Sequence, residues 1–340
     1  MSKILVTGGM GFIGTNLIRF LINKKQTNVL VLDKVTYAAN INSHQDLVNN
    51  DFYKFVKVDI CDVSALRNAI LEYKPDKIMH LAAESHVDNS INSPGAFIYS
   101  NIIGTYNLLK VSLEYYSQLD DSQCKGFRFH HISTDEVYGS LKDTEDSFNE
   151  KNQYNPNSPY SASKASSDHL VRAWNKTYKL PTIITNCSNN YGPFQHPEKL
   201  IPVIIKHALE HKDIPVYGNG LQIRDWLHVN DHVDALYCVL NKGIIGETYN
   251  IGANNEVKNI ELINTICELI DQIKPSKKLN TYKSLIKHVE DRKGHDIRYA
   301  INSSKVNNNL DWYPKINFKD GIVDTIKWYL ENNNWLKDFK

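Results

Sequence analysis

The chain has 340 residues, 41% of them hydrophobic and 23% charged, which is enough for one large or two modest globular domains. Its 39 basic and 38 acidic residues are mixed along the chain, which argues against a nucleic-acid or membrane partner. Five widely spaced cysteines without a CxxC pair give neither a disulfide framework nor a zinc site, and they favour a cytoplasmic protein. No apolar run approaches the ~20 residues of a membrane-spanning helix, so we expect a soluble protein.

Short β-rich runs alternate with amphipathic helical stretches through the first half of the chain. We expect strands at residues 3–8, 28–34, 53–59, 77–84, 126–133 and 181–186. Between them the pattern predicts helices that begin near residue 12, cover 63–73 and 96–116, and open at residue 158. This alternation predicts an α/β fold, a Rossmann-type doubly wound parallel sheet of roughly six strands.

Gly, Pro and Asn cluster in the stretch NCSNNYGPFQHPEKLIP, which begins at residue 186. After it we expect irregular segments and short helices that build a smaller α/β domain. The predicted domains are residues 1–187 and residues 188–340. A strand-like run, ETYNIGA, predicts that part of the segment near 222–252 returns to the first domain.

The glycine-rich stretch VTGGMGFIG follows the first expected strand and opens the first expected helix. Gly8, Gly11 and Gly14 allow a tight turn and let a pyrophosphate approach the helix N-terminus. Asp33 ends the next strand, where a carboxylate accepts hydrogen bonds from ribose hydroxyls and repels a 2′-phosphate. This pattern predicts NAD, rather than NADP, as the cofactor. The other residues expected to contact NAD are Phe12, Ile13, Lys34, Thr36, Asp59, Ile60, Leu81, Ala82, Ala83, Ser100 and Asn190, with Tyr160 and Lys164.

A tyrosine and a lysine four residues apart on a helix face the same side, where the ammonium can lower the pKa of the phenol and make it a base. This spacing occurs at Tyr53/Lys57, Tyr73/Lys77, Tyr106/Lys110, Tyr138/Lys142 and Tyr160/Lys164. The last pair opens a helix behind Ser158 and Pro159, which favour a helix N-terminus, and it follows the strand that carries Thr134. We therefore predict that Tyr160 and Lys164 are catalytic.

Two acids, Asp135 and Glu136, stand side by side in ISTDEVYG, residues 132–139, where a strand should end. Adjacent residues on a regular strand point to opposite faces, so two acids share a pocket only beyond the strand end. Two carboxyl groups held close together do not both ionise freely, which would keep one of them protonated. From the residues alone, a pair of solvated loop acids stays the alternative.

The motifs TGGMGFIG, STDEVYG, YSASK, NCSNNYGP, PEKLIP, IRDWLHV and DRKGHDIRY together resemble the nucleotide-sugar 4,6-dehydratases of the extended short-chain dehydrogenase/reductase superfamily. The resemblance covers about residues 3–335 and implies dehydration of dTDP-glucose or UDP-glucose to the 4-keto-6-deoxy sugar nucleotide, as in rhamnose-type deoxysugar biosynthesis. It implies that Tyr160 is the base at the sugar 4-hydroxyl and that Thr134 hydrogen-bonds the same oxygen. Glu136 would then be the base at C5, and Asp135 the acid at the C6 hydroxyl.

The resemblance also implies a substrate site, which spans both expected domains. Its residues would be Ser85, Thr134, Asn189, Lys199, Leu200, Pro215, Tyr217, Arg224, Asn259, Arg292 and His295. His130 and His131 lack metal-ligand spacing, so no metal is expected. A homodimer is expected through the apolar helical stretch around Ile98 to Tyr116 and the helix that opens at Tyr160.

Two other functions stay open on the sequence. The first is a nucleotide-sugar 4-epimerase, which would use Tyr160 and NAD but no proton transfer by Asp135 and Glu136. The second is a non-catalytic NAD-binding regulator, against which the intact Tyr160 and Lys164 argue. The choice between dTDP and UDP also stays open, because one methyl group in a pocket is worth only about 1–3 kcal/mol.

Overall fold

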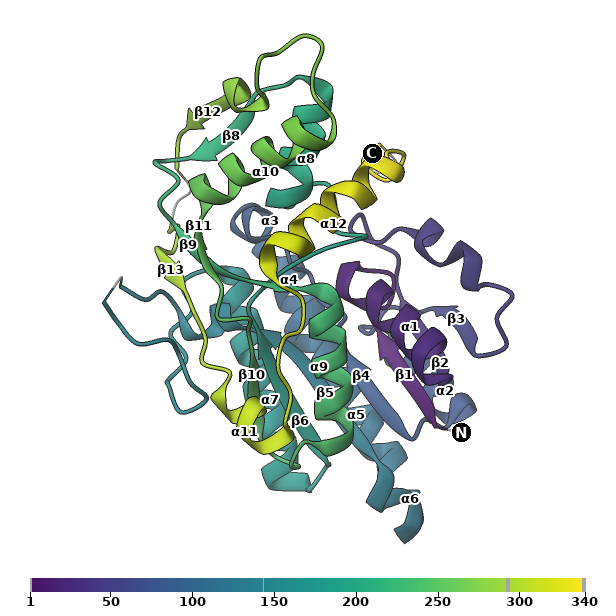
Figure 1. Cartoon of the computed structure of the whole chain (residues 1–340). Coiled ribbons are helices and arrows are strands. Elements are labelled where there is room, and N and C mark those ends of the chain that lie inside the picture. Colours follow the sequence, from purple (N-terminus) through teal and green to yellow (C-terminus); the bar gives the residue numbers. More distant parts are fainter. Residues whose placement is uncertain (1, 143, 292–293, 338–340) are drawn as a thin grey trace.

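The computed structural model describes residues 2–142, 144–291 and 294–337, and a seven-stranded parallel sheet lies at its centre (Figure 1). In spatial order the strands are β3 (Tyr53–Lys57), β2 (Asn28–Asp33), β1 (Lys3–Thr7), β4 (Lys77–His80), β5 (Arg128–Thr134), β6 (Thr182–Cys187) and β10 (Thr248–Ile251). The strand order reverses between β1 and β4, and ligands of doubly wound sheets bind at the carboxyl edge beside such a reversal. The predicted fold class is confirmed.

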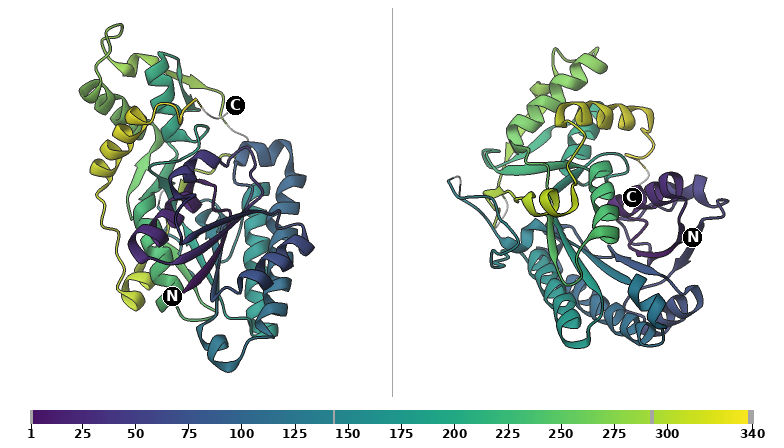
Figure 2. Two further views of the ribbon diagram at one scale, coloured as in Figure 1. Left: turned by 90° about the vertical axis from the view of Figure 1, so that its right-hand side faces the viewer. Right: turned by 60° about the horizontal axis from the view of Figure 1, so that its bottom comes forward.

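Helices cover both faces of this sheet (Figure 2) because successive residues of a strand point to opposite sides. Ile4 and Val6 of β1 pack in one core with α1 (Phe12–Lys25) and α9 (Val229–Lys242). Leu5, between them, packs in a second core with α2 (Val63–Tyr73), α5 (Gly104–Tyr116) and α7 (Pro159–Tyr178). Shorter helices in this half are η1 (Ile41–Leu47), α3 (Val87–Asn92), α4 (Pro94–Phe97), α6 (Asp121–Gly126) and η3 (Asp135–Tyr138).

The helix expected over residues 96–116 is not a uniform α-helix. Between α4 and α5 the backbone winds as a π-helix, η2 (Ile98–Ile103), and such turns are frequent at functional sites. Gly104 follows directly, and a Cβ at this position would lie 2.5 Å from Cδ1 of Ile60. The glycine therefore lets the helix approach the carboxyl end of β3 closely, and it places Ser100 of η2 near that edge.

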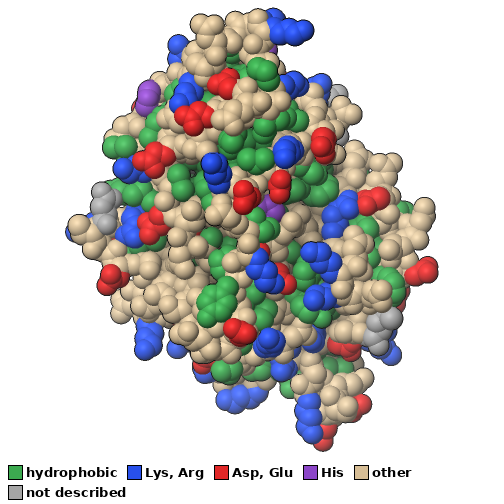
Figure 3. Space-filling view, viewed as in Figure 1, with side chains coloured by type: hydrophobic (Ala, Val, Ile, Leu, Met, Phe, Trp, Pro, Cys, Tyr) green, Lys and Arg blue, Asp and Glu red, His purple; other side chains and the backbone are tan. Residues whose placement is uncertain are grey.

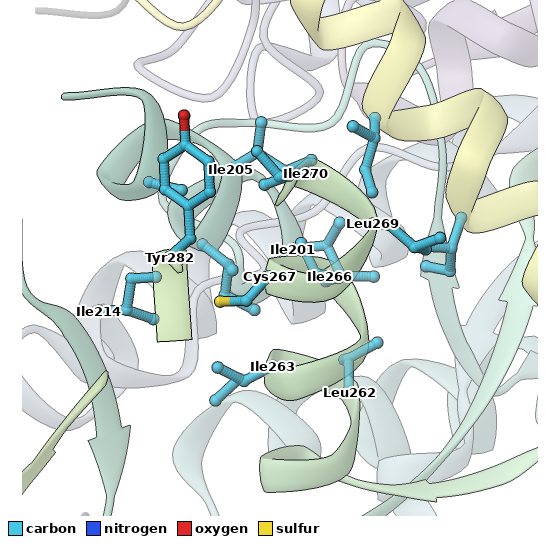
Figure 4. Close-up of a cluster of buried hydrophobic side chains, with 14 of the residues drawn as sticks. Ile201, Ile205, Ile214, Leu262, Ile263, Ile266, Cys267, Leu269, Ile270 and Tyr282 are labelled. Carbon is cyan, nitrogen blue, oxygen red and sulfur yellow. The ribbon is translucent and has the colours of Figure 1, made fainter. Parts of the chain in front are cut away.

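The second half of the chain forms a separate core above the sheet edge. Its strands are β7 (Asn189–Tyr191), β9 (Ile223–His228), β11 (Glu256–Lys258) and β13 (Arg298–Tyr299) in one sheet, and β8 (Ile214–Tyr217) with β12 (Ile286–Val289) as a parallel pair. Its helices are α8 (Leu200–Glu210), α10 (Asn259–Ile273), η4 (Tyr282–Leu285) and α12 (Phe318–Glu331). Figure 4 shows the apolar side chains of α8 and α10 packed together. The expectation of short helices was wrong: α10 has 15 residues, because its apolar residues recur at helical spacing and are buried.

The chain returns to the main sheet in two places. α9 covers the face that also carries α1, and β10 pairs with β6, whereas α11 (Ser304–Leu310) packs beside β10. The return predicted near 222–252 therefore begins only after β9, which lies in the four-stranded sheet. The division into domains at residues 187 and 188 stays a prediction.

Charged side chains are distributed over the surface without separation of sign in the view of Figure 3, where Lys and Arg neighbour Asp and Glu. Within the parts of the chain that the structure describes, no helix combines the length and the apolar character needed to span a bilayer. The five cysteines are free thiols.

Candidate active site

A cavity of about 310 Å³ opens at the carboxyl ends of the central strands. It brings together most of the residues predicted to bind cofactor or substrate: Gly8, Gly11, Phe12, Ile13, Gly14, Asp33, Lys34, Thr36, Ile60, Leu81, Ala82, Ala83, Ser85, Ser100, Thr134, Asp135, Glu136, Tyr160, Lys164, Asn189, Asn190 and Lys199. The cavity runs from the glycine loop at β1 to the end of β6. One continuous site therefore holds the expected dinucleotide region and the expected catalytic residues.

The glycine loop fits the pyrophosphate of a dinucleotide. Gly8 has φ +72°, and a Cβ on Gly14 would lie 2.3 Å from the carbonyl oxygen of Gly8, so the turn needs both glycines. Gly11 is the N-cap of α1; it provides no side-chain cap, and the first turn carries no acid. The backbone amides and the positive end of this helix thus face the cavity, and its first turn adds no carboxylate, which suits an anionic ligand.

Asp33 ends β2 at the cavity wall. Its carboxylate accepts hydrogen bonds from the backbone amides of Met10, at 3.0 Å, and Val35, at 2.7 Å. Burial raises the pKa of Asp33, and these two bonds oppose the rise. The carboxylate is therefore fixed by the backbone at the position where a ribose would bind. Lys34 lies beside it, with Nζ 3.4 Å from the Glu84 carboxylate.

We expect Asp33→Asn to weaken NAD binding by about 10- to 100-fold and to reduce the preference over NADP, because charged hydrogen bonds contribute about 1.5–3 kcal/mol. Titration of the variant with both dinucleotides measures the change. Asp51→Asn, in an exposed turn before β3, is the matched control and should bind NAD like the parent. Tighter binding of NADP than of NAD by the unmodified chain would contradict the role of Asp33.

The start of α7 places Tyr160 and Lys164 in the cavity. Ser158 and Ser161 form a capping box, and Pro159 occupies the first helical position, so the first turn is fixed. Lys164 is buried, and its Nζ donates a hydrogen bond of 2.9 Å to the carbonyl of Ile132. The other tyrosine–lysine pairs lie in β3 (Tyr53/Lys57), between α2 and β4 (Tyr73/Lys77), in α5 (Tyr106/Lys110) and from η3 into the following loop (Tyr138/Lys142), outside the cavity lining of the described chain.

Burial raises the pKa of Tyr160 well above its usual value, and the negative charge of Glu136 adds to the rise. A hydrogen bond from Thr134 acts in the opposite direction. The lowering of the Tyr160 pKa that we expect from Lys164 stays a prediction. The spacing of the residues indicated the lysine, but neither the burial of the tyrosine nor the contribution of Glu136.

The acid pair occupies the first turn of η3. β5 ends at Thr134, whose hydroxyl oxygen accepts a bond of 3.2 Å from the Glu136 amide and lies 3.3 Å from Oδ1 of Asp135. Burial raises the pKa of Asp135 well above its usual value, and the charges of Glu136 and Asp225 raise it further. Burial therefore favours the protonated form of Asp135 over the carboxylate, beside the more exposed Glu136.

Several predicted residues lie outside this cavity lining: Asp59, Leu200, Pro215, Tyr217, Arg224, Asn259 and His295. Arg292 lies outside the described residues. The Arg224 guanidinium is buried, donates to the carbonyls of Ile223 and Asp296, and stacks 4.4 Å from the ring centroid of Tyr299. Its charge lowers the pKa of Asp135, so Arg224 acts on the acid pair although it does not line the cavity.

The sequence reading missed part of the cavity wall, namely Leu32, Ala38, Ala39, Val58, Glu84, Ile132, Ser133, Cys187, Ser188, Gln195, His196 and Glu198. Glu198 lies 3.7 Å from both His86 and His196, and the ring centroids of His196 and Tyr37 are 5.8 Å apart. Lys199 Nζ donates to the Ser85 carbonyl at 3.2 Å. These contacts join the two halves of the chain at the cavity mouth. The stretch HPEK, residues 196–199, could have indicated this part of the wall, but the sequence analysis assigned a role only to Lys199.

No group of three or more His, Cys, Asp or Glu residues with metal-binding geometry occurs among the residues that the structure describes. A dinucleotide-binding sheet, a capped Tyr160–Lys164 helix and an adjacent acid pair in one cavity are the features of a short-chain dehydrogenase/reductase scaffold equipped for acid–base chemistry.

Comparison with known proteins gives the family. Residues 5–325 match the model of the GDP-mannose 4,6 dehydratase family. A dTDP-glucose 4,6-dehydratase of Neisseria meningitidis serogroup B is 54% identical over 98% of this chain and 95% of its own length. The crystal structure of dTDP-glucose 4,6-dehydratase from Bacillus anthracis in complex with NAD has 43% identity, a TM-score of 0.87 and complete coverage of both chains. The dTDP-glucose 4,6-dehydratase of Streptomyces venezuelae, also with NAD bound, has 39% identity and a TM-score of 0.90 over 99% of this chain and 100% of the other.

The chain belongs to the nucleotide-sugar 4,6-dehydratase family of the extended short-chain dehydrogenases/reductases. The resemblance predicted from its motifs is confirmed.

Proposed function

We propose that this chain catalyses the NAD-dependent dehydration of dTDP-glucose to dTDP-4-keto-6-deoxyglucose. The observation that carries the proposal is the buried Asp135 beside Glu136 in the same cavity as Tyr160 and Lys164. The family and the names of the relatives support the sugar nucleotide.

Tyr160 is the base for oxidation at C4, and Thr134 hydrogen-bonds the same oxygen. The Lys164 ammonium lies one helical turn away and favours the phenolate. When bound, NAD supplies a cationic nicotinamide ring that accepts the C4 hydride and later returns it to C6.

Water is then eliminated across C5 and C6. The C4 ketone acidifies the C5 proton, which Glu136 removes, while Asp135 donates its proton to the leaving C6 hydroxyl. Glu136 returns the proton to C5 when C6 receives the hydride, which gives the 4-keto-6-deoxy sugar. C5 and C6 are bonded neighbours, so adjacent side chains on one short turn can serve both atoms. The different environments of the two carboxyl groups support this division of roles, because burial raises the pKa of Asp135 and so favours its protonated form.

Ser85, Asn189 and Lys199, on the cavity wall, are proposed substrate contacts, together with the other residues that the resemblance implies. UDP-glucose is the second candidate substrate. The 4-epimerase alternative is disfavoured because it assigns no proton transfer to Asp135, and the regulator alternative because Tyr160 and Lys164 are both intact and placed in the cavity. That the product of this reaction enters a rhamnose-type deoxysugar pathway stays a prediction.

Incubation of the purified protein with dTDP-glucose, UDP-glucose and NAD, followed by mass analysis of the sugar nucleotide, tests the proposal. Loss of one water from dTDP-glucose is the expected result. A product of unchanged mass with inverted C4 would establish the epimerase instead, and an unchanged substrate with bound NAD would favour the regulator.

We also propose that the chain is a homodimer through η2, α5 and α7. Ile98, Tyr99, Ile103 and Tyr106 expose apolar surface on η2 and α5, and the Tyr106 ring contacts Trp174 of α7 with centroids 5.9 Å apart. These side chains line adjacent helices, so their burial against a second copy would remove apolar surface from water.

Ile103→Asp should therefore shift the protein from dimer to monomer in sedimentation at micromolar concentration, because the charge would be buried at the interface. Ile244→Asp changes an isoleucine that is also exposed but follows α9, and this variant should stay dimeric. A monomer in the unmodified protein contradicts the proposal.

A further inference from the structure

Behind Lys164 lies a buried polar cluster that the proposed mechanism does not use. Asp168 follows Lys164 by one helical turn on the same face of α7 and is only 2% exposed. Nε2 of His131, on β5, lies 3.1 Å from its Oδ1 atom. A charged carboxyl group at this depth is costly unless a specific interaction offsets the desolvation.

The Lys164 ammonium, four residues before Asp168, is also buried, whereas Arg172, four residues after it, is exposed. Burial lowers the pKa of Lys164, and the charge of Asp168 is the largest effect that opposes the lowering. Burial likewise raises the pKa of Asp168 to about 6, and Lys164 is the largest effect in the other direction. Each charge therefore supports the ionised form of the other.

We propose that Asp168 is the positioning residue of the catalytic pair: its buried carboxylate keeps Lys164 protonated beneath Tyr160 and ties α7 to the end of β5. The inference rests on the proposed function, since it assigns Lys164 the task of stabilising the Tyr160 phenolate. Asp168 itself does not touch the substrate.

Hydrogen bonds connect the carboxylate to the strand ends that carry the catalytic residues. Ser133 Oγ donates to Oδ2 at 2.9 Å, and Asn186 Nδ2 donates to the same oxygen at 3.3 Å. Asn186 Nδ2 also lies 3.0 Å from the Thr134 carbonyl. Asp168 thus fixes the side chain before Thr134 and, through Asn186, the backbone of Thr134, so that Tyr160 and Thr134 keep their relative position.

The titratable groups that interact with the Lys164–Asp168 pair or neighbour it are His80 on β4, His131 on β5, Tyr138 on η3, Tyr154 before α7, Tyr160 on α7 and Cys187 on β6. Burial lowers the pKa of His80 and of His131 well below the usual value, so both rings are neutral. Burial raises the pKa of Tyr154 far above its usual value and that of Cys187 to about 12, so neither carries charge near neutral pH. None of these neighbours can replace the charge of Asp168.

The test measures single-turnover formation of NADH from dTDP-glucose between pH 6 and 10. Asp168→Asn is nearly isosteric but removes the charge that holds the lysine proton. The rate of NADH formation should fall about tenfold or more, the equivalent of one pKa unit, and the alkaline limb of the profile should move to lower pH. Asp168→Glu should restore part of the rate, and the alkaline limb of its profile should move back toward that of the parent.

Combining Asp168→Asn with Lys164→Met separates positioning from a purely structural role. If Asp168 acts through the ammonium, adding Asp168→Asn to Lys164→Met should change the residual rate less than about twofold and should raise the melting temperature, because the uncompensated carboxylate is removed. Equal rate losses in both backgrounds, with an unmoved alkaline limb, would overturn the proposal.

The melting temperatures do not depend on turnover, so the cycle is informative even if Lys164→Met is inactive. The activity of the unmodified protein separates the two proposals. If the unmodified protein forms neither NADH nor dehydrated product, the proposed function fails; if it does both but the cycle shows no coupling, only the role of Asp168 fails.

Discussion

Changing Asp135→Asn and Glu136→Gln together should leave oxidation at C4 in place but lower formation of dehydrated product by about 10²–10⁴-fold, the usual contribution of general acid–base catalysis. Oxidation needs Tyr160, Lys164 and NAD, whereas elimination needs the acid and the base. The double variant should therefore accumulate NADH and a 4-keto sugar that retains its 6-hydroxyl.

The structure favours a folded double variant. Asp135 is buried, and burial disfavours its charged form, so an uncharged amide of the same shape suits this position. Single-turnover absorbance of NADH, combined with mass analysis of the sugar, separates the two half-reactions. Glu145→Gln with Asp146→Asn changes another adjacent acid pair, which is exposed in a loop, and should react like the parent.

Two results would contradict the assignment. Dehydration at the parent rate would mean that Asp135 and Glu136 transfer no proton in the elimination. Failure to form NADH by a folded, NAD-bound double variant would mean that the acids position the sugar, and the two half-reactions could not be separated at this turn.

The parts of the site that could be predicted from the sequence are those fixed by local rules. The glycine loop, Asp33 at a strand end and Tyr160 behind a Ser-Pro cap each depend on a few neighbouring residues, and the structure places all of them in one cavity. The order of the parallel strands follows the usual rules of doubly wound folds, so the fold class could be predicted as well.

What could not be predicted depends on contacts between distant segments. The pKa of Tyr160 is set by burial and by Glu136, and the surroundings of Arg224 are set by Tyr299 and Asp296, which lie far along the chain. The spacing of residues contains no information on such burial. Asp168 could not be identified from the sequence for the same reason. An acid on a helix is normally solvated, and only the packed structure shows that this one is buried.

The lengths of the helices in the second half were underestimated for a different reason. The sequence LIPVIIKHALE carries apolar residues at spacings of three and four, and Ile201, Ile204, Ile205 and Ala208 are all buried in the core shown in Figure 4. The periodicity was present, but the Gly, Pro and Asn residues just before it suggested irregular structure.

Tyr160→Phe should abolish both half-reactions, because no other group in the described cavity combines a phenol with a hydrogen bond from Thr134 and a lysine one turn away. Without the hydroxyl, the C4 proton has no acceptor and NADH should not form. We expect a loss of at least 10²–10⁴-fold in NADH formation. The dehydrated product should fall by the same factor, since elimination requires the ketone.

Tyr106→Phe is the matched control, because Tyr106 and Lys110 repeat the same spacing on α5 outside the cavity lining. This variant should form NADH and dehydrated product at the parent rates. NAD binding by Tyr160→Phe, measured by titration, should stay within a few fold of the parent, because the glycine loop and Asp33 are unchanged. If Tyr160→Phe binds NAD and still reduces it at the parent rate, another base must take the C4 proton; if Tyr106→Phe is the variant that stops the reaction, the spacing was assigned to the wrong helix.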